Sequence, residues 1–213
     1  MCFLRDLSQK EAVETFTQFL SIKSQNEIPN LDKIIGIGLD SSEINNPPEK
    51  FTELYKLAKE NNFRLCCHCH DEGSLEHIKT AVNTLKVERI DHGIDISLEE
   101  EFLQSCTDNK TPFTFCPLST LKVQRVRTLE PYKIKYLLNK NLLFSINSDD
   151  PGFFRGYIGD NYLLIQKEYN LKIEELSQIA ENSINSTFLS AEAKTLLHEK
   201  LNKYLSNYCI KNN

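Results

Sequence analysis

Short apolar runs alternate with amphipathic segments from the amino terminus to residue 147. The apolar runs suit buried strands, and they lie at 2–5, 34–39, 64–68, 88–92, 112–116 and 142–147. Buried strands that alternate with helices are typical of parallel sheets built from βα units. The pattern therefore predicts six βα units and an α/β fold.

The segments between the runs carry helix signals. Two of them, Ser8-Gln-Lys-Glu11 and Ser97-Leu-Glu-Glu100, have the capping-box pattern, in which a serine caps the helix and a glutamate lies three residues further on. Pro47-Pro48 opens another helix, because proline suits the first helical turn. We expect helices over 8–23, 47–60, 74–85, 97–106 and 132–139, with a loop through Ser119.

Beyond Pro151 the pattern predicts helices only, over 160–169, 173–182 and 191–209. No low-complexity stretch or Gly/Ser-rich linker interrupts the chain, so residues 1–213 are interpreted as a single domain. Six βα units fit either an open doubly wound sheet or an eight-stranded barrel that lacks two strands. Periodicity alone does not choose between these two folds.

Charge and cysteine content narrow the class of protein. The net charge is −5, and Lys and Arg are scattered, which disfavours nucleic acid and anionic membranes as partners. No apolar run approaches the roughly 18 residues of a transmembrane helix, and the first residues do not form a signal peptide. Three of the seven cysteines, Cys66, Cys67 and Cys69, are too crowded for separate unstrained disulfides. We expect reduced thiols and a cytoplasmic protein.

The densest chemical cluster ends the third apolar run and reads Cys66-Cys67-His68-Cys69-His70-Asp71-Glu72. Because side chains alternate along a strand, both histidines share a face with Cys66 while the other two cysteines lie opposite, so one metal ion does not gather all five. The cluster also fits a structural cysteine-rich strand followed by an exposed acidic turn. A zinc ribbon is disfavoured, because Cys66-x-x-Cys69 has no second pair at similar spacing.

Two further strand ends carry ionisable side chains. His92 closes the fourth run, and Asp149 and Asp150 follow the sixth. Each also has a structural interpretation. His92 can be a strand-end histidine whose neighbours satisfy its hydrogen bonds, and Asp149 and Asp150 can belong to a polar turn that ends the strand. Together with His68, however, they place imidazole and carboxylate groups where parallel α/β folds bind ligands, at the carboxyl ends of strands. We expect these four residues to converge there. Such groups suit zinc and metal-assisted hydrolysis, with His68 and Asp149 as ligands and His92 as a base.

The motifs at these strand ends resemble, in order and spacing, those of the adenosine and adenine deaminases. The matching segments are His68-Cys-His-Asp-Glu-Gly73, Arg89-Ile-Asp-His-Gly93, Cys116-Pro-Leu-Ser119 and Ser148-Asp-Asp-Pro151. Gly38-Leu-Asp-Ser-Ser-Glu43, Ile90-Asp-His-Gly93 and Phe154-Arg-Gly-Tyr157 are more similar to the adenine deaminase branch. The resemblance implies a (β/α)₈ barrel that binds one zinc ion, of which the six strands here are the third to the eighth.

The resemblance also implies roles for individual residues. His68 and Asp149 become zinc ligands, and His92 orients and deprotonates the attacking water. Asp150 hydrogen-bonds the purine at N7, and Ser41 lies near a position whose backbone contacts the base. In the family, hydroxide on zinc attacks C6 of the purine, a glutamic acid protonates N1, and ammonia leaves to give hypoxanthine from adenine.

The proton donor is where this chain departs from the family. The family's His-Ala-Gly-Glu corresponds to His68-Cys69-His70-Asp71, so the donor Asp71 is one methylene shorter and an imidazole replaces a glycine. Glu72 follows, but it needs a one-residue shift to take the donor's place.

The family's remaining zinc ligands form a His-x-His motif on the first strand, and no such motif occurs before His68. We therefore expect the carboxyl-terminal part of a deaminase, from a truncated gene product or an incomplete gene model. With two ligands it should bind zinc weakly, and the apolar strands 2–5 and 142–147 should favour self-association at exposed sheet edges. The alternatives are an adenosine deaminase, a catalytically degenerate pseudoenzyme that acts as a binding partner, and a structural globular protein.

Overall fold

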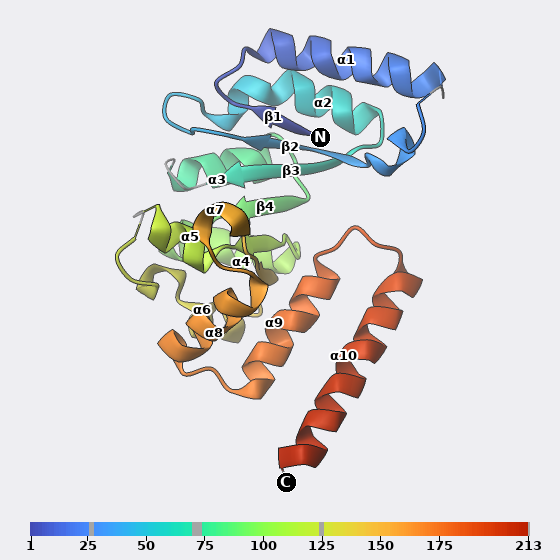
Figure 1. Ribbon diagram of the computed structural model, residues 1–213. Coiled ribbons are helices and arrows are strands. Elements are labelled where there is room, and N and C mark those ends of the chain that lie inside the picture. The colour runs from blue at the N-terminus through green and yellow to red at the C-terminus, as the bar shows by residue number, and fades with distance from the viewer. Residues whose placement is uncertain (26–27, 70–73, 124–125, 213) are drawn as a thin grey trace. The chain divides into compact units, whose positions relative to one another are not determined.

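A computed structural model describes residues 1–25, 28–69, 74–123 and 126–212 of the chain. Its contacts divide the chain into two compact units, Met1–Leu103 and Gln104–Asn213. Figure 1 gives the order of the elements along the chain, from β1 to α10. We describe each unit by itself.

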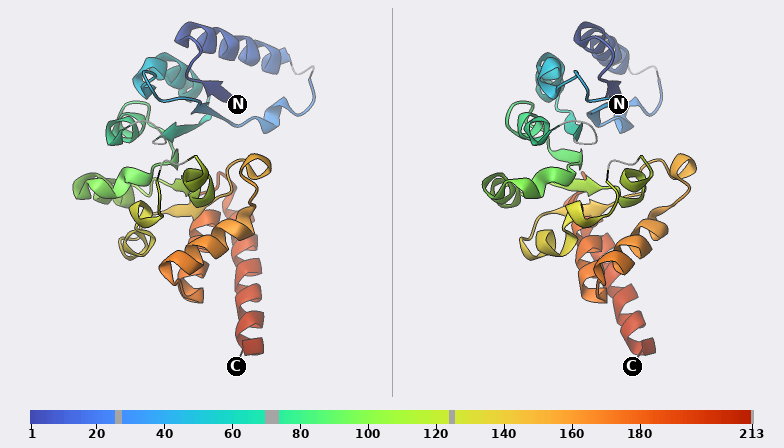
Figure 2. Two further views of the ribbon diagram at one scale, coloured as in Figure 1. Left: turned by 60° about the vertical axis from the view of Figure 1, so that its left-hand side comes forward. Right: turned by 90° about the vertical axis from the view of Figure 1, so that its left-hand side faces the viewer.

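The first unit is a parallel sheet with its helices on one side. Its strands β1 (Cys2–Leu4), β2 (Gly36–Asp40), β3 (Arg64–Cys69) and β4 (Arg89–His92) pair in chain order, each parallel to the next. The helices α1 (Gln9–Gln25), α2 (Thr52–Glu60) and α3 (Leu75–Asn83) connect them and lie on the same side of the strands (Figure 2). Three short 3₁₀ helices cover Leu31–Lys33, Pro48–Phe51 and Ile94–Leu98. This arrangement is a series of βα units.

The second unit contains a parallel strand pair and most of the helices. β5 (Phe113–Phe115) pairs with β6 (Phe144–Ile146), with Phe113 opposite Phe144. α4 (Glu100–Asp108) spans the division between the units. The other helices are α5 (Pro117–Lys122), α6 (Ile134–Asn139), α7 (Pro151–Phe154), α8 (Ile158–Tyr169), α9 (Ile173–Asn185) and α10 (Ala191–Asn212), with a 3₁₀ turn at Glu130–Tyr132. α9 packs on β6, and α10 packs on α9.

Aromatic rings fill the core of each unit. In the first, Phe16 is fully buried, and its ring lies 5.2 Å from that of Phe63 and 6.2 Å from that of Phe3. In the second, the ring of Phe115 lies 5.0 Å from that of Phe144, next to Tyr132. Burying such rings removes a large apolar area from water and stabilises each sheet against its helices.

The predicted strands are confirmed, and one of the two predicted capping boxes is present. Ser8 Oγ accepts the backbone N–H of Glu11 at 3.1 Å, and Glu11 accepts that of Ser8 at 3.1 Å. The box at Ser97 is wrong, because Ser97 lies inside the 3₁₀ helix Ile94–Leu98 and α4 begins at Glu100. Gly93, at a φ of 80°, permits the turn that buries Ile94 and Ile96 there.

The predicted loop through Ser119 is also wrong, because these residues form α5. Pro117 occupies its first turn, where the missing N–H costs nothing, and Ser119 and Thr120 donate to the carbonyl of Cys116.

Within the described ranges, no helix is both long enough and apolar enough to cross a bilayer.

Replacing Phe16 with alanine should lower the free energy of unfolding by about 3–5 kcal/mol, because it opens a cavity in the aromatic core. Urea denaturation followed by circular dichroism measures this change. Phe153 is 80% exposed, so the matched variant Phe153→Ala should stay within about 0.5 kcal/mol of the parent chain. Equal effects of the two substitutions would contradict the core described above.

Candidate active site

Three of the candidate site residues have left-handed backbone conformations at strand ends. The φ angles are 76° at Ser41, 65° at His92 and 56° at Asp149. Residues with side chains adopt this region at a cost, and such strain is concentrated at functional sites. Ser41 follows β2, His92 ends β4, and Asp149 follows β6, so each conformation turns the chain away from a sheet at its carboxyl edge.

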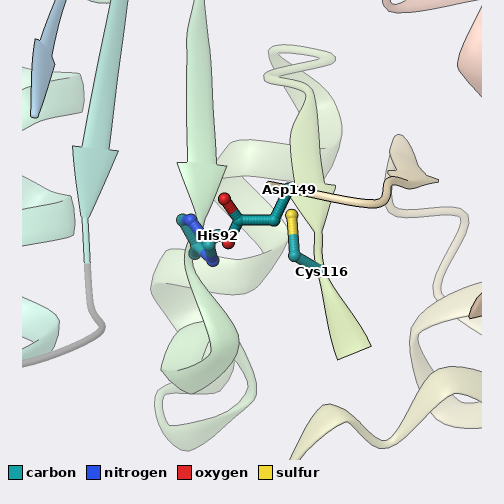
Figure 3. A group of neighbouring side chains, drawn as sticks. All are labelled: His92, Cys116 and Asp149. Atoms are coloured by element: carbon teal, nitrogen blue, oxygen red, sulfur yellow. The ribbon is translucent and has the colours of Figure 1, made fainter. Parts of the chain in front are cut away.

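In the first unit the structure brings His68 and His92 together. His68 lies opposite Asp91 in the β3–β4 register, one position before Cys69 and His92. The two imidazole rings have centroids 4.4 Å apart. His92 is buried at the end of β4 (Figure 3), whereas the side chain of His68 is 17% exposed. Two imidazoles therefore face one another at the carboxyl edge, as we expected from the sequence.

Carboxylates flank both nitrogens of the His68 ring. Nδ1 lies 3.5 Å from Asp40 Oδ1, and Nε2 lies 3.6 Å from Glu43 Oε1. Glu43 is 1% exposed, and its other oxygen lies 3.3 Å from Nδ1 of His77. α3 turns the ring of His77, 18% exposed, toward this buried carboxylate. Glu43 was not predicted as a site residue, although it ends the Gly38–Glu43 motif.

The cysteines of β3 are buried. Cys67 and Cys69 are fully buried on the same side of the strand, with their sulfur atoms 3.5 Å apart. Burial raises the pKa of the Cys66 thiol to about 12 and raises that of Cys69 as well. A zinc ligand must be a thiolate, and burial disfavours this form of Cys66 and Cys69 in the absence of a metal ion. The described cysteines are free thiols, as expected.

In the second unit Asp149 lies beside Cys116. A carboxylate oxygen of Asp149 is within 4.8 Å of the Cys116 sulfur, and Figure 3 shows these side chains next to one another. Asp149 is exposed, whereas Cys116 is 5% exposed. Cys116 begins the Cys116–Ser119 motif, and no role was predicted for it from the sequence.

The other predicted residues have different surroundings. Asp150 is exposed and precedes α7, where its carbonyl accepts the N–H groups of Phe153 and Phe154. The backbone N–H of Ser41 donates to Asp40 Oδ1 at 2.7 Å. Asp71, the predicted proton donor, lies outside the described residues together with His70 and Glu72.

The chain matches the sequence model of a known protein family, and it is similar to several known proteins. The model described as adenosine deaminase matches residues 1–204. The chain is 41% identical over 194 residues to the adenine deaminase of Psychrobacter cryohalolentis, covering 91% of this chain and 56% of that protein. It is 38% identical over 208 residues to the adenine deaminase of Schizosaccharomyces pombe, covering 98% of this chain and 56% of that protein. The chain thus spans little more than half the length of these relatives.

Solved structures with similar folds include an adenine deaminase. The enzyme from Arthrobacter aurescens has a TM-score of 0.88 and 36% identity, covering 96% of this chain and 60% of its own. An amidohydrolase from Burkhoderia ambifaria with bound Zn has a TM-score of 0.84 and 22% identity, covering 99% of this chain and 57% of its own, which shows a shared fold. These matches confirm the predicted fold class, α/β with the βα units of a (β/α)₈ barrel.

The burial of the thiols predicts their alkylation by iodoacetamide. At about pH 8, Cys66 and Cys106 should react far more slowly in the native chain than in urea, because burial blocks the reagent and raises both pKa values to about 12. Cys2 is exposed, but partial burial of its thiol and the nearby Asp40 carboxylate raise its pKa to about 11, so its rate should rise about tenfold per pH unit up to that value. Peptide mass spectrometry measures each rate, and rapid native alkylation of Cys66 or Cys106 would contradict the packing.

Proposed function

Because the chain belongs to the adenosine deaminase family, we propose that the protein catalyses the zinc-dependent hydrolytic deamination of adenine to hypoxanthine and ammonia. The observation that carries the proposal is the identity of about 40% to curated adenine deaminases over more than nine tenths of the chain. The motifs Gly38–Glu43 and Phe154–Tyr157 support the same branch. The activity is proposed for the whole protein, since this chain covers 56–60% of the relatives' lengths.

We propose His68 and Asp149 as zinc ligands. Their imidazole nitrogen and carboxylate oxygen are donor types that zinc binds, so these residues fit the ion by their chemistry. Both follow the family motifs, and both are within reach of solvent, His68 with 17% of its side chain exposed and Asp149 exposed. A bound zinc ion supplies Lewis acidity, which makes water acidic enough to attack near neutral pH.

The remaining residues handle protons and the base. His92 accepts the proton of the attacking water, whose oxygen forms a bond to C6 of adenine. Asp71 donates a proton to N1 of the ring. His92 returns the proton it took from water to the amino nitrogen, the bond from C6 to that nitrogen breaks as ammonia leaves, and the proton of the C6 hydroxyl returns to Asp71 to give the carbonyl of hypoxanthine. Asp150 hydrogen-bonds N7, and Ser41 contacts the base through its backbone. Asp71 is one methylene shorter than the family's glutamic acid, and a misplacement of about 1 Å can cost about 10²-fold in rate.

Two other functions are alternatives, and the deamination experiment described below distinguishes them. An adenosine deaminase would use the same residues on a larger substrate. A pseudoenzyme would bind a purine or a protein without turnover, and the aspartate and histidine at positions 71 and 70 would then mark lost activity.

We also propose a small-molecule purine as the partner of the protein. We propose a cytoplasmic location, which the free thiols support. Self-association through the sheet edges at β1 and β6 stays a prediction.

Deamination of adenine should be measured in the chain and in a chimera that adds the amino-terminal part of the Psychrobacter cryohalolentis adenine deaminase. We expect near-zero turnover by the chain itself and measurable hypoxanthine from the chimera. Combining Asp71→Glu with His70→Gly in the chimera should raise turnover by up to about 10²-fold, because the donor then reaches N1. Chelation should abolish the activity and added zinc should restore it.

The matched control is Asp108→Glu, which lengthens an exposed aspartate of α4 and should leave turnover unchanged. Adenosine serves as the competing substrate, and a preference for it would favour the adenosine branch. A chimera that is folded and zinc-loaded but turns over neither substrate, even with the Asp71→Glu substitution, would favour the pseudoenzyme.

A further inference from the structure

Asn161, near the start of α8, has a fully buried side chain that joins two helices. It is 0% exposed. Its Oδ1 accepts the backbone N–H of Leu118 at 3.0 Å, and its Nδ2 donates to the carbonyl of Tyr157 at 3.0 Å. The two bonds require an acceptor and a donor in one side chain, which an asparagine amide supplies. Because Leu118 belongs to α5, the amide links α5 to the residue that precedes α8.

Gly156 lets the same segments approach one another closely. A Cβ atom at this position would lie 2.0 Å from Cδ2 of Leu118, so a larger residue would have to push the leucine side chain away. The N–H of Gly156 donates to the carbonyl of Pro151 at 3.3 Å, which ties it to the first residue of α7. α5 packs on both α7 and α8. The joint between α7 and α8 therefore rests directly on α5.

α7 connects this joint to the turn at Asp149 and Asp150. The N–H of Phe154, the last residue of α7, donates to the carbonyl of Asp150 at 2.8 Å. On the other side of the turn, a carboxylate oxygen of Asp149 is within 4.8 Å of the sulfur of Cys116, which directly precedes α5. These contacts close a ring that runs through α5, Asn161, α7 and the two aspartates.

We propose that Asn161 is a positioning residue for the turn that carries Asp149 and Asp150. Asp149 has a φ of 56°, a left-handed conformation that costs free energy and persists only where the surrounding structure holds it. The hydrogen bonds of Asn161 provide such a restraint, because they fix α7 relative to α5 and hence the turn relative to Cys116. The assignment rests on the proposed roles of Asp149 in binding zinc and of Asp150 in binding the purine.

Stability alone does not explain an amide in this place. An apolar side chain would pack α8 on α5 without removing a polar group from water. A buried amide that is fully hydrogen-bonded adds only modestly to stability, but it fixes the direction of the groups that it joins. Those groups belong to the motifs Cys116–Ser119 and Phe154–Tyr157, which have no assigned role in the proposed reaction. Holding the neighbouring turn in place gives both motifs a role.

The test follows the backbone ¹H–¹⁵N signals of Asp149 and Asp150 in the 213-residue chain. Asn161→Ala removes both hydrogen bonds of the amide, and we expect it to shift the signals of both aspartates. The matched control is Asn182→Ala in α9, which removes another buried asparagine that donates to a backbone carbonyl, that of Leu142 at 3.5 Å. The control should lower the stability of the same unit and leave the signals of the two aspartates in place.

A measurement on the unaltered chain guards against loss of the fold in the variant. In urea below the unfolding transition, amide hydrogen exchange reports local opening. If Asn161 couples the two segments, the N–H of Leu118 and the N–H of Phe154 should exchange through one opening, with the same urea dependence. Different urea dependences would overturn the proposal. So would unchanged signals of Asp149 and Asp150 in a folded Asn161→Ala chain.

Kinetics of the chimera separate this proposal from the proposed function. Asn161→Ala should lower kcat/KM on adenine about 10–100-fold, because a displacement of about 1 Å in the turn misplaces both aspartates. Asn182→Ala should leave kcat/KM unchanged. If the chimera without either substitution does not turn over adenine, the proposed function fails, and the amide signals and exchange rates still decide whether Asn161 holds the turn.

Discussion

Parallel pairing of the strands is the constraint on which each unit depends. Strands that run in the same direction present all their carboxyl ends at one edge, and helices must return the chain to the other edge. In the first unit this pairing brings the His68 and His92 rings to 4.4 Å. In the second unit the β5–β6 pair brings Asp149 to within 4.8 Å of Cys116. The polar residues of each edge are therefore neighbours in space although they are distant in sequence.

Burial then determines which of these side chains are chemically available. Cys67 and Cys69 are fully buried on one side of β3, where burial raises the pKa of the Cys69 thiol. The imidazole of His68, on the other side of the strand, meets two carboxylates. One of them, Glu43, is as deeply buried as the core and requires Arg5 and His77 around it. A strand with alternating faces thus separates Cys67 and Cys69 from the histidine for which we propose metal binding.

The sequence predicted the strands and most helices because their signals are local. Apolar runs and the Ser8 box need only neighbouring residues, and they were found. The Ser97 box failed because burial of Ile94 and Ile96 outweighed the capping pattern. The contacts of Glu43 with Arg5, His68 and His77 join residues that lie far apart in the sequence, and no local pattern contains them. The positions of His68, His92 and Asp149 at strand ends could be predicted, whereas the residues around them could not.

Zinc-edge anomalous diffraction from crystals grown with zinc tests the central assignment most directly, because it locates the ion without requiring turnover. The result we predict is an anomalous peak within zinc bonding distance, about 2.0–2.2 Å, of an imidazole nitrogen of His68 and a carboxylate oxygen of Asp149. A peak bound by other residues, with neither His68 nor Asp149 among its ligands, would contradict the account.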